Sequence, residues 1–237
     1  MKPLEPKETL AGYKDILRPP DDPQREYVLN GCTYGELHRI ASGLHGLSKR
    51  GENAAICICT EDRALFMAAL LSSLAGGPRV VLPYALSPQA LAEIHASLPV
   101  FLLVADRSGA GHLPAGPEIV ISSELSRSSD MPVEPRAYDD PFLYLFTGGS
   151  TGIPRIWPKT PRNLLAEAAF HAETLGITGK DVFLATVPPY HIYGLLFSVL
   201  VPFFGSARVL NETFVFPKEI VRSVQRFPAS VLVSVPP

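Results

Sequence analysis

Cysteine is scarce in this sequence, and its spacing excludes a zinc-type metal site. There are three cysteines, an odd number, at Cys32, Cys57 and Cys59. None of them has the spacing of metal ligands. Cys57 and Cys59 stand two positions apart in an apolar run, which places both on one face of a strand. We therefore predict buried free thiols in a reducing compartment.

Long apolar runs and an excess of charge are also absent. The longest apolar stretch, residues 192–204, is too short to span a bilayer and contains Pro202. The first residues, M-K-P-L-E-P, lack the apolar core of a secretory signal. A net charge of −2 gives no electrostatic footprint for nucleic acid. We therefore expect no membrane span, no nucleic-acid partner and a cytoplasmic location.

Strand patterns alternate with helix patterns along most of the chain, and there is no internal repeat or low-complexity segment. Strands are expected at residues 54–59, 79–82, 100–104, 118–121, 142–146, 181–187, 207–210 and 230–235, and helices at 34–49, 61–74, 87–98, 160–175, 195–204 and 217–226. This alternation predicts an α/β fold of mostly parallel sheets with flanking helices. Residues 1–24, which hold five prolines, are expected to form an irregular arm.

One loop has a composition that fits polyphosphate. Residues 147–152 read T-G-G-S-T-G and follow an apolar strand. Glycine lets the main chain approach a ligand closely, and successive backbone N–H groups can surround an anion. Arg155, Lys159 and Arg162 follow within ten residues of Gly152, which predicts a locally positive field around the loop.

Two other known types of loop, the P-loop and the nucleophile elbow, share parts of the pattern at residues 147–152. The P-loop of nucleotide hydrolases needs a Gly-Lys-Ser/Thr step at the start of a helix, but Gly152 is followed by Ile-Pro-Arg. Residues 148–152 match the G-x-S-x-G pattern of a nucleophile elbow. That elbow needs a helix directly after Ser150, and Pro154 and Pro158 oppose a helix there.

The third interpretation is a family resemblance. Residues 144–155 look like the signature of the acyl-adenylate-forming enzymes, which include acyl-CoA synthetases, adenylation domains and luciferases. Further motifs similar to that family follow in its order: T-Y-G-E-L at 33–37, L-A-G-G at 74–77, Thr160 with Asn163 and Leu164, Pro188 with His191 and Gly194, and the apolar run at 231–237. Together they cover nearly all of residues 25–237.

The resemblance implies a reaction and a set of site residues. In this family a carboxylate attacks the α-phosphate of Mg²⁺-bound ATP, and the acyl group then passes to CoA or to the phosphopantetheine of a carrier protein. By resemblance, the phosphates are held by Thr147, Gly148, Gly149, Ser150, Thr151, Gly152 and Arg155, with Thr151 contacting Mg²⁺ through the nucleotide. Arg155 stands where a lysine is usual in the family. His191 is the catalytic candidate, and Tyr190 and Tyr193 are candidates for the acyl pocket.

The family's later motifs are not in this sequence. Its adenine-binding motif, ribose-binding aspartate and C-terminal domain with a catalytic lysine all come after the position that matches Pro237. The resemblance therefore implies the N-terminal part of the large domain, and we expect no adenylation activity from this part alone. The small carboxylic acid cannot be named, and an acyl carrier protein is a possible partner.

Two alternative functions stay open at this point. One is a non-catalytic nucleotide-binding or interaction module. The other is a serine hydrolase that uses Ser150, with Asp181 and His191 as partners.

Overall fold

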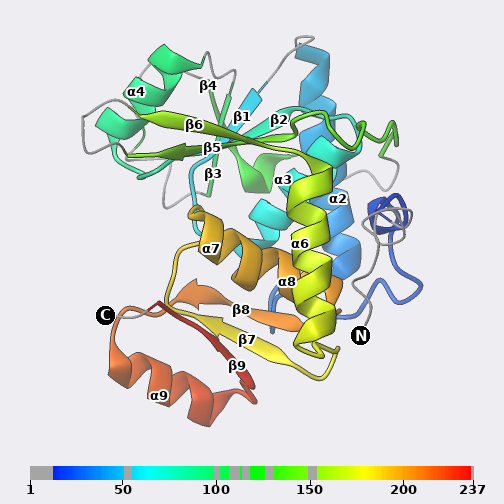
Figure 1. Cartoon of the computed structure of the whole chain (residues 1–237), viewed down its shortest axis with the longest axis vertical. Helices are drawn as coiled ribbons and strands as arrows, with labels where there is room; N and C mark the ends of the chain where they lie inside the picture. The colour runs from blue at the N-terminus through cyan, green and yellow to red at the C-terminus, as the bar shows by residue number, and fades with distance from the viewer. Residues whose placement is uncertain are drawn as a thin grey trace.

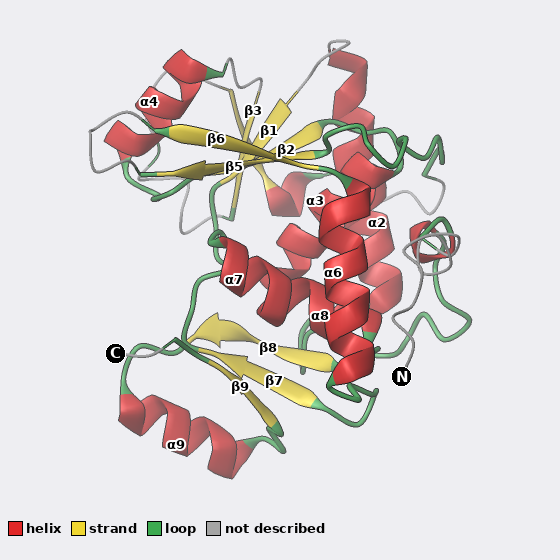
Figure 2. Cartoon of the chain, in the orientation of Figure 1, coloured by secondary structure: helices red, strands yellow, loops and turns green. Residues whose placement is uncertain are grey.

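The computed structural model describes residues 13–50, 55–98, 102–106, 113, 118–125, 131–148 and 154–235. A six-stranded sheet and a three-stranded sheet lie on opposite sides of a layer of helices (Figure 1). Figure 2 shows the same arrangement in the same orientation, with helices between the two sets of strands. The predicted α/β architecture is confirmed.

The larger sheet is parallel except at one edge. Its strands are β1 (Ala55–Ile58), β2 (Arg79–Leu82), β3 (Leu102–Ala105), β4 (Glu118–Ile121), β5 (Leu143–Thr147) and β6 (Arg155–Lys159). Their order is β4-β3-β1-β2-β5-β6, and only β5 and β6 pair antiparallel. The sequence did not predict β6, because Pro158 argues against a strand. An edge strand tolerates proline, since one side of its backbone needs no donor.

The smaller sheet contains β7 (Val182–Ala185), β8 (Arg208–Thr213) and β9 (Val231–Val233) in the order β8-β7-β9. All its pairs are parallel. Helix α9 (Pro217–Arg226) covers its outer face, where Ile220 packs against Leu184 and Leu210.

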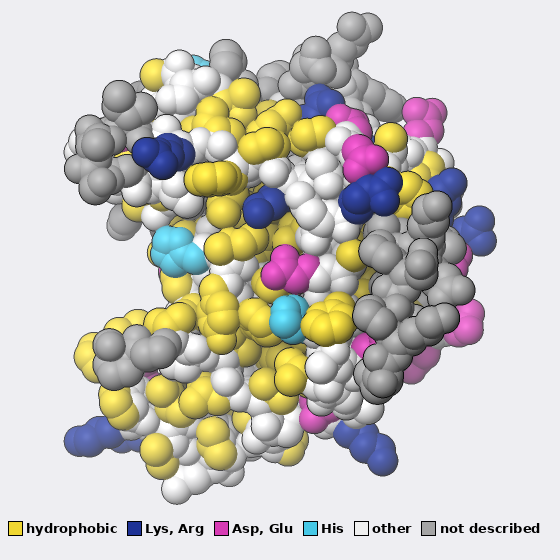
Figure 3. Space-filling model, viewed as in Figure 1, with side chains coloured by type: hydrophobic (Ala, Val, Ile, Leu, Met, Phe, Trp, Pro, Cys, Tyr) yellow, Lys and Arg dark blue, Asp and Glu magenta, His cyan; other side chains and the backbone are white. Residues whose placement is uncertain are grey.

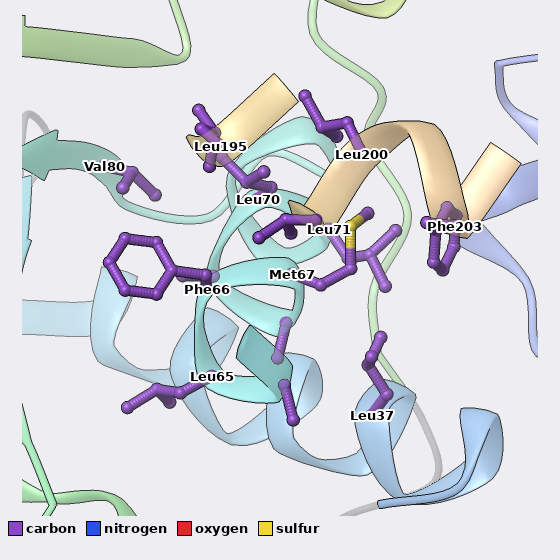
Figure 4. Close-up of a cluster of buried hydrophobic side chains, with 14 of the residues drawn as sticks. Leu37, Leu65, Phe66, Met67, Leu70, Leu71, Val80, Leu195, Leu200 and Phe203 are labelled. Atoms are coloured by element: carbon purple, nitrogen blue, oxygen red, sulfur yellow. The ribbon is translucent and has the colours of Figure 1, made fainter. Parts of the chain in front are cut away.

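The helical layer is built around α3 (Arg63–Leu74), whose twelve residues are all buried. Around it lie α2 (Tyr34–His45), α6 (Pro161–Thr174) and an apolar segment formed by α7 (Ile192–Leu195), a π-helical turn η4 (Leu196–Leu200) and α8 (Val201–Phe204). Figure 4 shows α3 side chains such as Met67 and Leu71 between α2 and this segment. Each fully buried apolar side chain contributes roughly 2 kcal/mol of burial free energy.

The remaining helices are short or peripheral. Helix α4 (Pro88–Ser97) covers the other face of the large sheet, and single 3₁₀ turns occur at η1 (Asp15–Leu17), η2 (Gly46–Arg50) and η3 (Ser122–Glu124). Cys57 and Cys59 are buried on the α4 side with their sulfurs 3.8 Å apart, and all three cysteines are free, as predicted. Within the described residues, no helix combines the length and apolarity needed to cross a bilayer.

Side-chain caps explain where the main helices begin. The Thr33 hydroxyl accepts from the Glu36 N–H while the Glu36 carboxylate accepts from the Thr33 N–H, which together form a capping box at the start of α2. Helix α3 was expected to begin at residue 61, directly after Thr60, but Thr60 is not its cap. Asp62 is the cap and accepts from the Ala64 and Leu65 N–H groups.

Candidate active site

The site lies where the two sheets approach each other through their loops. Tyr84 follows β2, and Thr147 ends the adjacent parallel strand β5, so both stand at the carboxyl edge of the large sheet. His191, from the turn after β7, lies opposite them. These residues, together with Leu145, Phe146, Gly148 and Ile192, line a pocket of about 300 Å³. The face seen in Figure 3 is hollowed between the parts that carry the two sheets, and hydrophobic side chains gather along this hollow.

The β5–β6 hairpin carries the predicted phosphate loop. Thr147 pairs directly with Arg155 across the hairpin, so the first and last described residues of the loop region are neighbours. Facing side chains in such a pair lie about 5 Å apart at Cβ. Gly148 lies beside the Tyr84 ring. Gly149, Ser150, Thr151, Gly152 and Ile153 lie outside the described residues.

Of the three cations expected around the loop, Arg155 lies at the end of the loop. Arg155 is exposed, and no ion-pair partner is found for it in the described part of the chain. Lys159 lies at the opposite end of β6, and Arg162 donates from Nε to Asp139 Oδ1 at 2.7 Å. The prediction of a positive field from all three cations is therefore wrong, because a strand carries two of them away from the loop.

His191 lies on a tight turn held by backbone contacts. Its N–H donates to the Pro188 carbonyl at 3.3 Å, and it caps α7. A Cβ on Gly194 would stand 2.0 Å from the Pro188 oxygen, so only glycine lets α7 approach the turn. Partial burial lowers the pKa of the His191 imidazole, while the nearby Glu61 carboxylate opposes that shift. The imidazole is therefore mainly neutral at pH 7, with one nitrogen that donates and one that accepts.

The two predicted pocket tyrosines do not line this pocket. Tyr190 packs against the hydrophobic core, with its ring 4.6 Å from the His191 ring. Tyr193 is 40% exposed and stacks at 4.8 Å on Phe197. Ile192 and Tyr84 line the pocket instead. Tyr84 was not singled out in the sequence, because strand ends that meet in space carry no local signal. Its hydroxyl donates to Glu93 at 2.5 Å.

A buried arginine that no sequence motif marks supports the His191 turn. Arg63, at the start of α3, is 0% exposed. Its guanidinium donates to the Val187 carbonyl, just before the turn, at 3.4 Å. It also donates to Ser198 Oγ at 3.2 Å, and the Ser198 hydroxyl donates to the Gly194 carbonyl at 2.7 Å. Further bonds reach β8 at Asn211 and Thr213. Arg63 thus joins α3 to the turn and to the smaller sheet.

The structure tests the two alternative loops. The chain is in strand β6 from Arg155 onward, where an elbow or a P-loop would continue as a helix. The hydrolase interpretation also needs Asp181 beside His191. Asp181 lies at the amino end of β7 and accepts from Ser230 and Thr178. His191 follows the other end of that strand, on the order of 15 Å away.

The donor set favours a phosphate ligand over a metal cage. Among the described residues, no group of three or more His, Cys, Asp or Glu side chains could hold a metal ion. Phosphate oxygens accept hydrogen bonds, and the Thr147 hydroxyl and Arg155 guanidinium can donate them.

Comparisons with known proteins show which family and fold this chain resembles. A family model described as AMP-binding enzyme matches residues 17–237. The 2-succinylbenzoate–CoA ligase of Bacillus velezensis is 30% identical over 172 residues, which cover 70% of this chain and 35% of that protein. The mitochondrial malonate–CoA ligase of Mus musculus is 28% identical over 193 residues, covering 76% and 30%.

Solved structures show the same fold. ATP-bound MatB from Rhodopseudomonas palustris superposes with a TM-score of 0.74 at 21% identity, covering 94% of this chain and 48% of that one. The N-terminal subdomain of Klebsiella oxytoca NpsA, in complex with 3-hydroxybenzoyl-AMSN, gives 0.71 at 16% identity, covering 93% and 59%. The chain thus has the fold of the large domain of adenylate-forming enzymes and spans about half the length of these structures.

Proposed function

The chain belongs to the AMP-binding enzyme family, and from that premise we propose that it is the N-terminal part of an ATP-dependent acid–thiol ligase. The reaction joins a carboxylic acid to ATP to give an acyl adenylate and pyrophosphate, and then passes the acyl group to a thiol. The single observation that supports this most is the β5–β6 hairpin. It holds Thr147 and Arg155 side by side, across a pocket from His191.

The phosphate loop acts on the leaving group. A carboxylate oxygen attacks the α-phosphorus, and the bond from that phosphorus to the bridging oxygen of pyrophosphate breaks. Negative charge then builds on pyrophosphate, so donors fixed in advance around it lower the barrier. Thr147 and Arg155 would supply a hydroxyl and a guanidinium there, and Gly148, Gly149, Ser150, Thr151 and Gly152 would supply the loop between them. Arginine keeps the charge of the family's usual lysine and can hold two phosphate oxygens at once.

His191 is proposed to act on the acyl side of the pocket. Its neutral imidazole can donate one hydrogen bond to the carboxylate or to an α-phosphate oxygen without adding charge. Tyr84 and Ile192 would form the adjacent wall. Mg²⁺ would bind with the ATP phosphates and contact Thr151, neutralising part of their charge.

The acid and the thiol are proposed only as classes. The curated relatives described above are CoA ligases, which supports CoA as acceptor. A structural neighbour with a TM-score of 0.70, McyG A-PCP complexed with phenylalanyl-adenylate, leaves an acyl carrier protein as the alternative. We assign residues 25–237 to the AMP-binding domain and residues 1–24 to a preceding arm. The predicted cytoplasmic location stays a prediction.

A binding experiment tests this proposal. Equilibrium dialysis of Mg²⁺-ATP against the chain should show binding that Arg155→Ala weakens by about tenfold, because one charge-assisted contact is lost. Arg222→Ala, on the exposed face of α9, is the matched control and should bind as the wild type does. Equal binding by the Arg155→Ala and Arg222→Ala variants would contradict the proposed loop. A fluorophosphonate probe should leave Ser150 unlabelled, since labelling would favour the hydrolase.

A further inference from the structure

The chain has a single tryptophan, and it contacts the proposed phosphate site. The indole N–H of Trp157 donates to the Thr147 hydroxyl oxygen, with 3.2 Å between Nε1 and Oγ1. Trp157 lies on the edge strand β6 and is 50% exposed. A half-exposed indole gains little from burial at this position, so core packing alone gives no reason for its orientation.

The strand register brings three functional groups to one face of the hairpin. Thr147 pairs with Arg155, and Leu145 pairs with Trp157. Side chains two positions apart on a strand point to the same face, so Thr147, Arg155 and Trp157 share a face. Trp157 is the diagonal neighbour of Thr147, a separation that a long aromatic side chain can bridge.

The direction of this hydrogen bond determines what Thr147 can do. An indole N–H only donates, whereas a hydroxyl donates one hydrogen bond and accepts up to two. The bond from Trp157 therefore occupies a lone pair of the Thr147 oxygen and leaves its proton pointing elsewhere. Within the described residues, no acceptor for that proton is found. Phosphate oxygens only accept hydrogen bonds, so a hydroxyl with a free proton suits them as a donor.

We propose that Trp157 is a positioning residue of this site: its indole N–H fixes the Thr147 hydroxyl so that the hydroxyl proton points to a bound polyphosphate. This inference rests on the proposed function, because it concerns the same ligand. It adds a residue outside the loop, on the strand that follows it. An indole that donates to Thr147 also makes the single tryptophan a direct reporter of the site.

The first test needs no ligand. A ¹H–¹⁵N spectrum of the chain should show one indole cross-peak, at the position of a hydrogen-bonded N–H. Thr147→Val should shift that peak upfield and speed its exchange with water, because the acceptor is gone. Thr147→Ser keeps a hydroxyl and should restore it, and Thr174→Val, at the end of α6, should leave it unchanged. An unchanged peak in Thr147→Val would overturn the inference.

The second test measures Mg²⁺-pyrophosphate affinity by calorimetry in a double-mutant cycle. Thr147→Val should weaken binding by about tenfold and Trp157→Phe by about threefold, as expected for a lost and a misdirected hydrogen bond. The double variant should bind like Thr147→Val alone, because Trp157 acts only through that hydroxyl. Urea unfolding of each variant checks that the fold is retained.

The outcomes separate this inference from the function on which it rests. If the wild type binds pyrophosphate and Trp157→Phe binds equally well, the positioning role is wrong and the phosphate site stands. The positioning role is also wrong if the double variant loses affinity by the product of the two single losses, because the two side chains would then act independently. If the wild type binds no pyrophosphate while the indole peak responds to Thr147→Val, the hydrogen bond is real but the proposed site, and with it this role, is wrong.

Discussion

Arg63 stabilises the molecule through hydrogen bonds, and among the described residues no acidic side chain forms an ion pair with it. Burial lowers the pKa of its guanidinium, and nearby Tyr27 and Glu61 oppose that shift. A buried charge costs several kcal/mol unless its donors are satisfied. Here the donors meet oxygens of Val187, Ser198, Asn211 and Thr213. These bonds offset the cost and tie the His191 turn to α3.

Replacing Arg63 should therefore destabilise the chain. Arg63→Met keeps much of the side-chain volume but leaves the Val187 and Asn211 carbonyls without this donor, and we expect a loss of roughly 2–4 kcal/mol in urea unfolding. Arg222→Met, on exposed α9, should change stability by less than about 0.5 kcal/mol. Unchanged or increased stability in Arg63→Met would contradict the account of these bonds.

His38 makes the stability depend on pH. It is 6% exposed, and burial lowers its pKa from 6.5 to about 4. Between these pH values His38 binds a proton in the unfolded chain but not in the folded chain. Its contribution to the free energy of unfolding is therefore fully present above pH 6.5 and is lost as the pH falls toward 4. Relative to His38→Gln, the wild type should lose roughly 2 kcal/mol more over that range. Parallel urea curves at each pH for the two proteins would contradict the shifted pKa.

Among the elements, the turn between β7 and α7 sets the position of His191. Helix α7 comes closest to this turn at Gly194, since an added Cβ there would lie 2.0 Å from the Pro188 carbonyl oxygen. Gly194→Ala should cost roughly 2–3 kcal/mol and shift the His191 ring resonances. Gly46→Ala is the control, because nothing lies within 4 Å of its added Cβ. It should be neutral or stabilise the chain by up to about 1 kcal/mol.

The elements also show what local sequence can and cannot predict. Most helices and strands follow from apolar periodicity and from caps such as Thr33 and Thr160. Strand β6 was missed because its pattern is exposed and contains Pro158, and only pairing with β5 makes it a strand. The π-helical turn at Leu196–Leu200 looks helical in sequence, and nothing local marks its wider turn.

The sequence predicted only part of the site, because several contacts of the site form only in the tertiary fold. Thr147, Gly148 and His191 were identified by motif, and the structure brings them to one pocket. Tyr84, Arg63 and Trp157 were not identified. They approach the site across 64, 124 and 10 residues of sequence respectively, as the pairs Tyr84–Gly148, Arg63–Val187 and Trp157–Thr147 show. Such contacts depend on the tertiary fold and leave no periodicity to detect.

At the scale of the whole molecule, the region of α9 and β9 exposes apolar surface. Exposed apolar residues gather around α9 and β9, namely Val215, Phe216, Val221, Val224, Leu232 and Val235. β9 is an edge strand with one neighbour, β7. The chain spans about half the length of the solved structures that share its fold. Phosphate binding by this chain and the complete reaction therefore need separate measurements.

The chain by itself should therefore show no acyl-dependent exchange of pyrophosphate into ATP. The reason is that the residues proposed here contact only the phosphates and one wall of the acyl pocket. The measurement is incorporation of labelled pyrophosphate into ATP, with a panel of short, long and aromatic carboxylic acids. Exchange above the level of the Ser150→Ala, Arg155→Ala double variant would contradict this expectation.

The central claim is that the loop after β5 is a polyphosphate site. Its most direct test is calorimetric titration of Mg²⁺-pyrophosphate into the chain, into Ser150→Ala and into Arg155→Ala. The account predicts measurable binding by the wild type that each substitution weakens by about tenfold. Binding that is absent from the wild type, or identical in all three proteins, would contradict it.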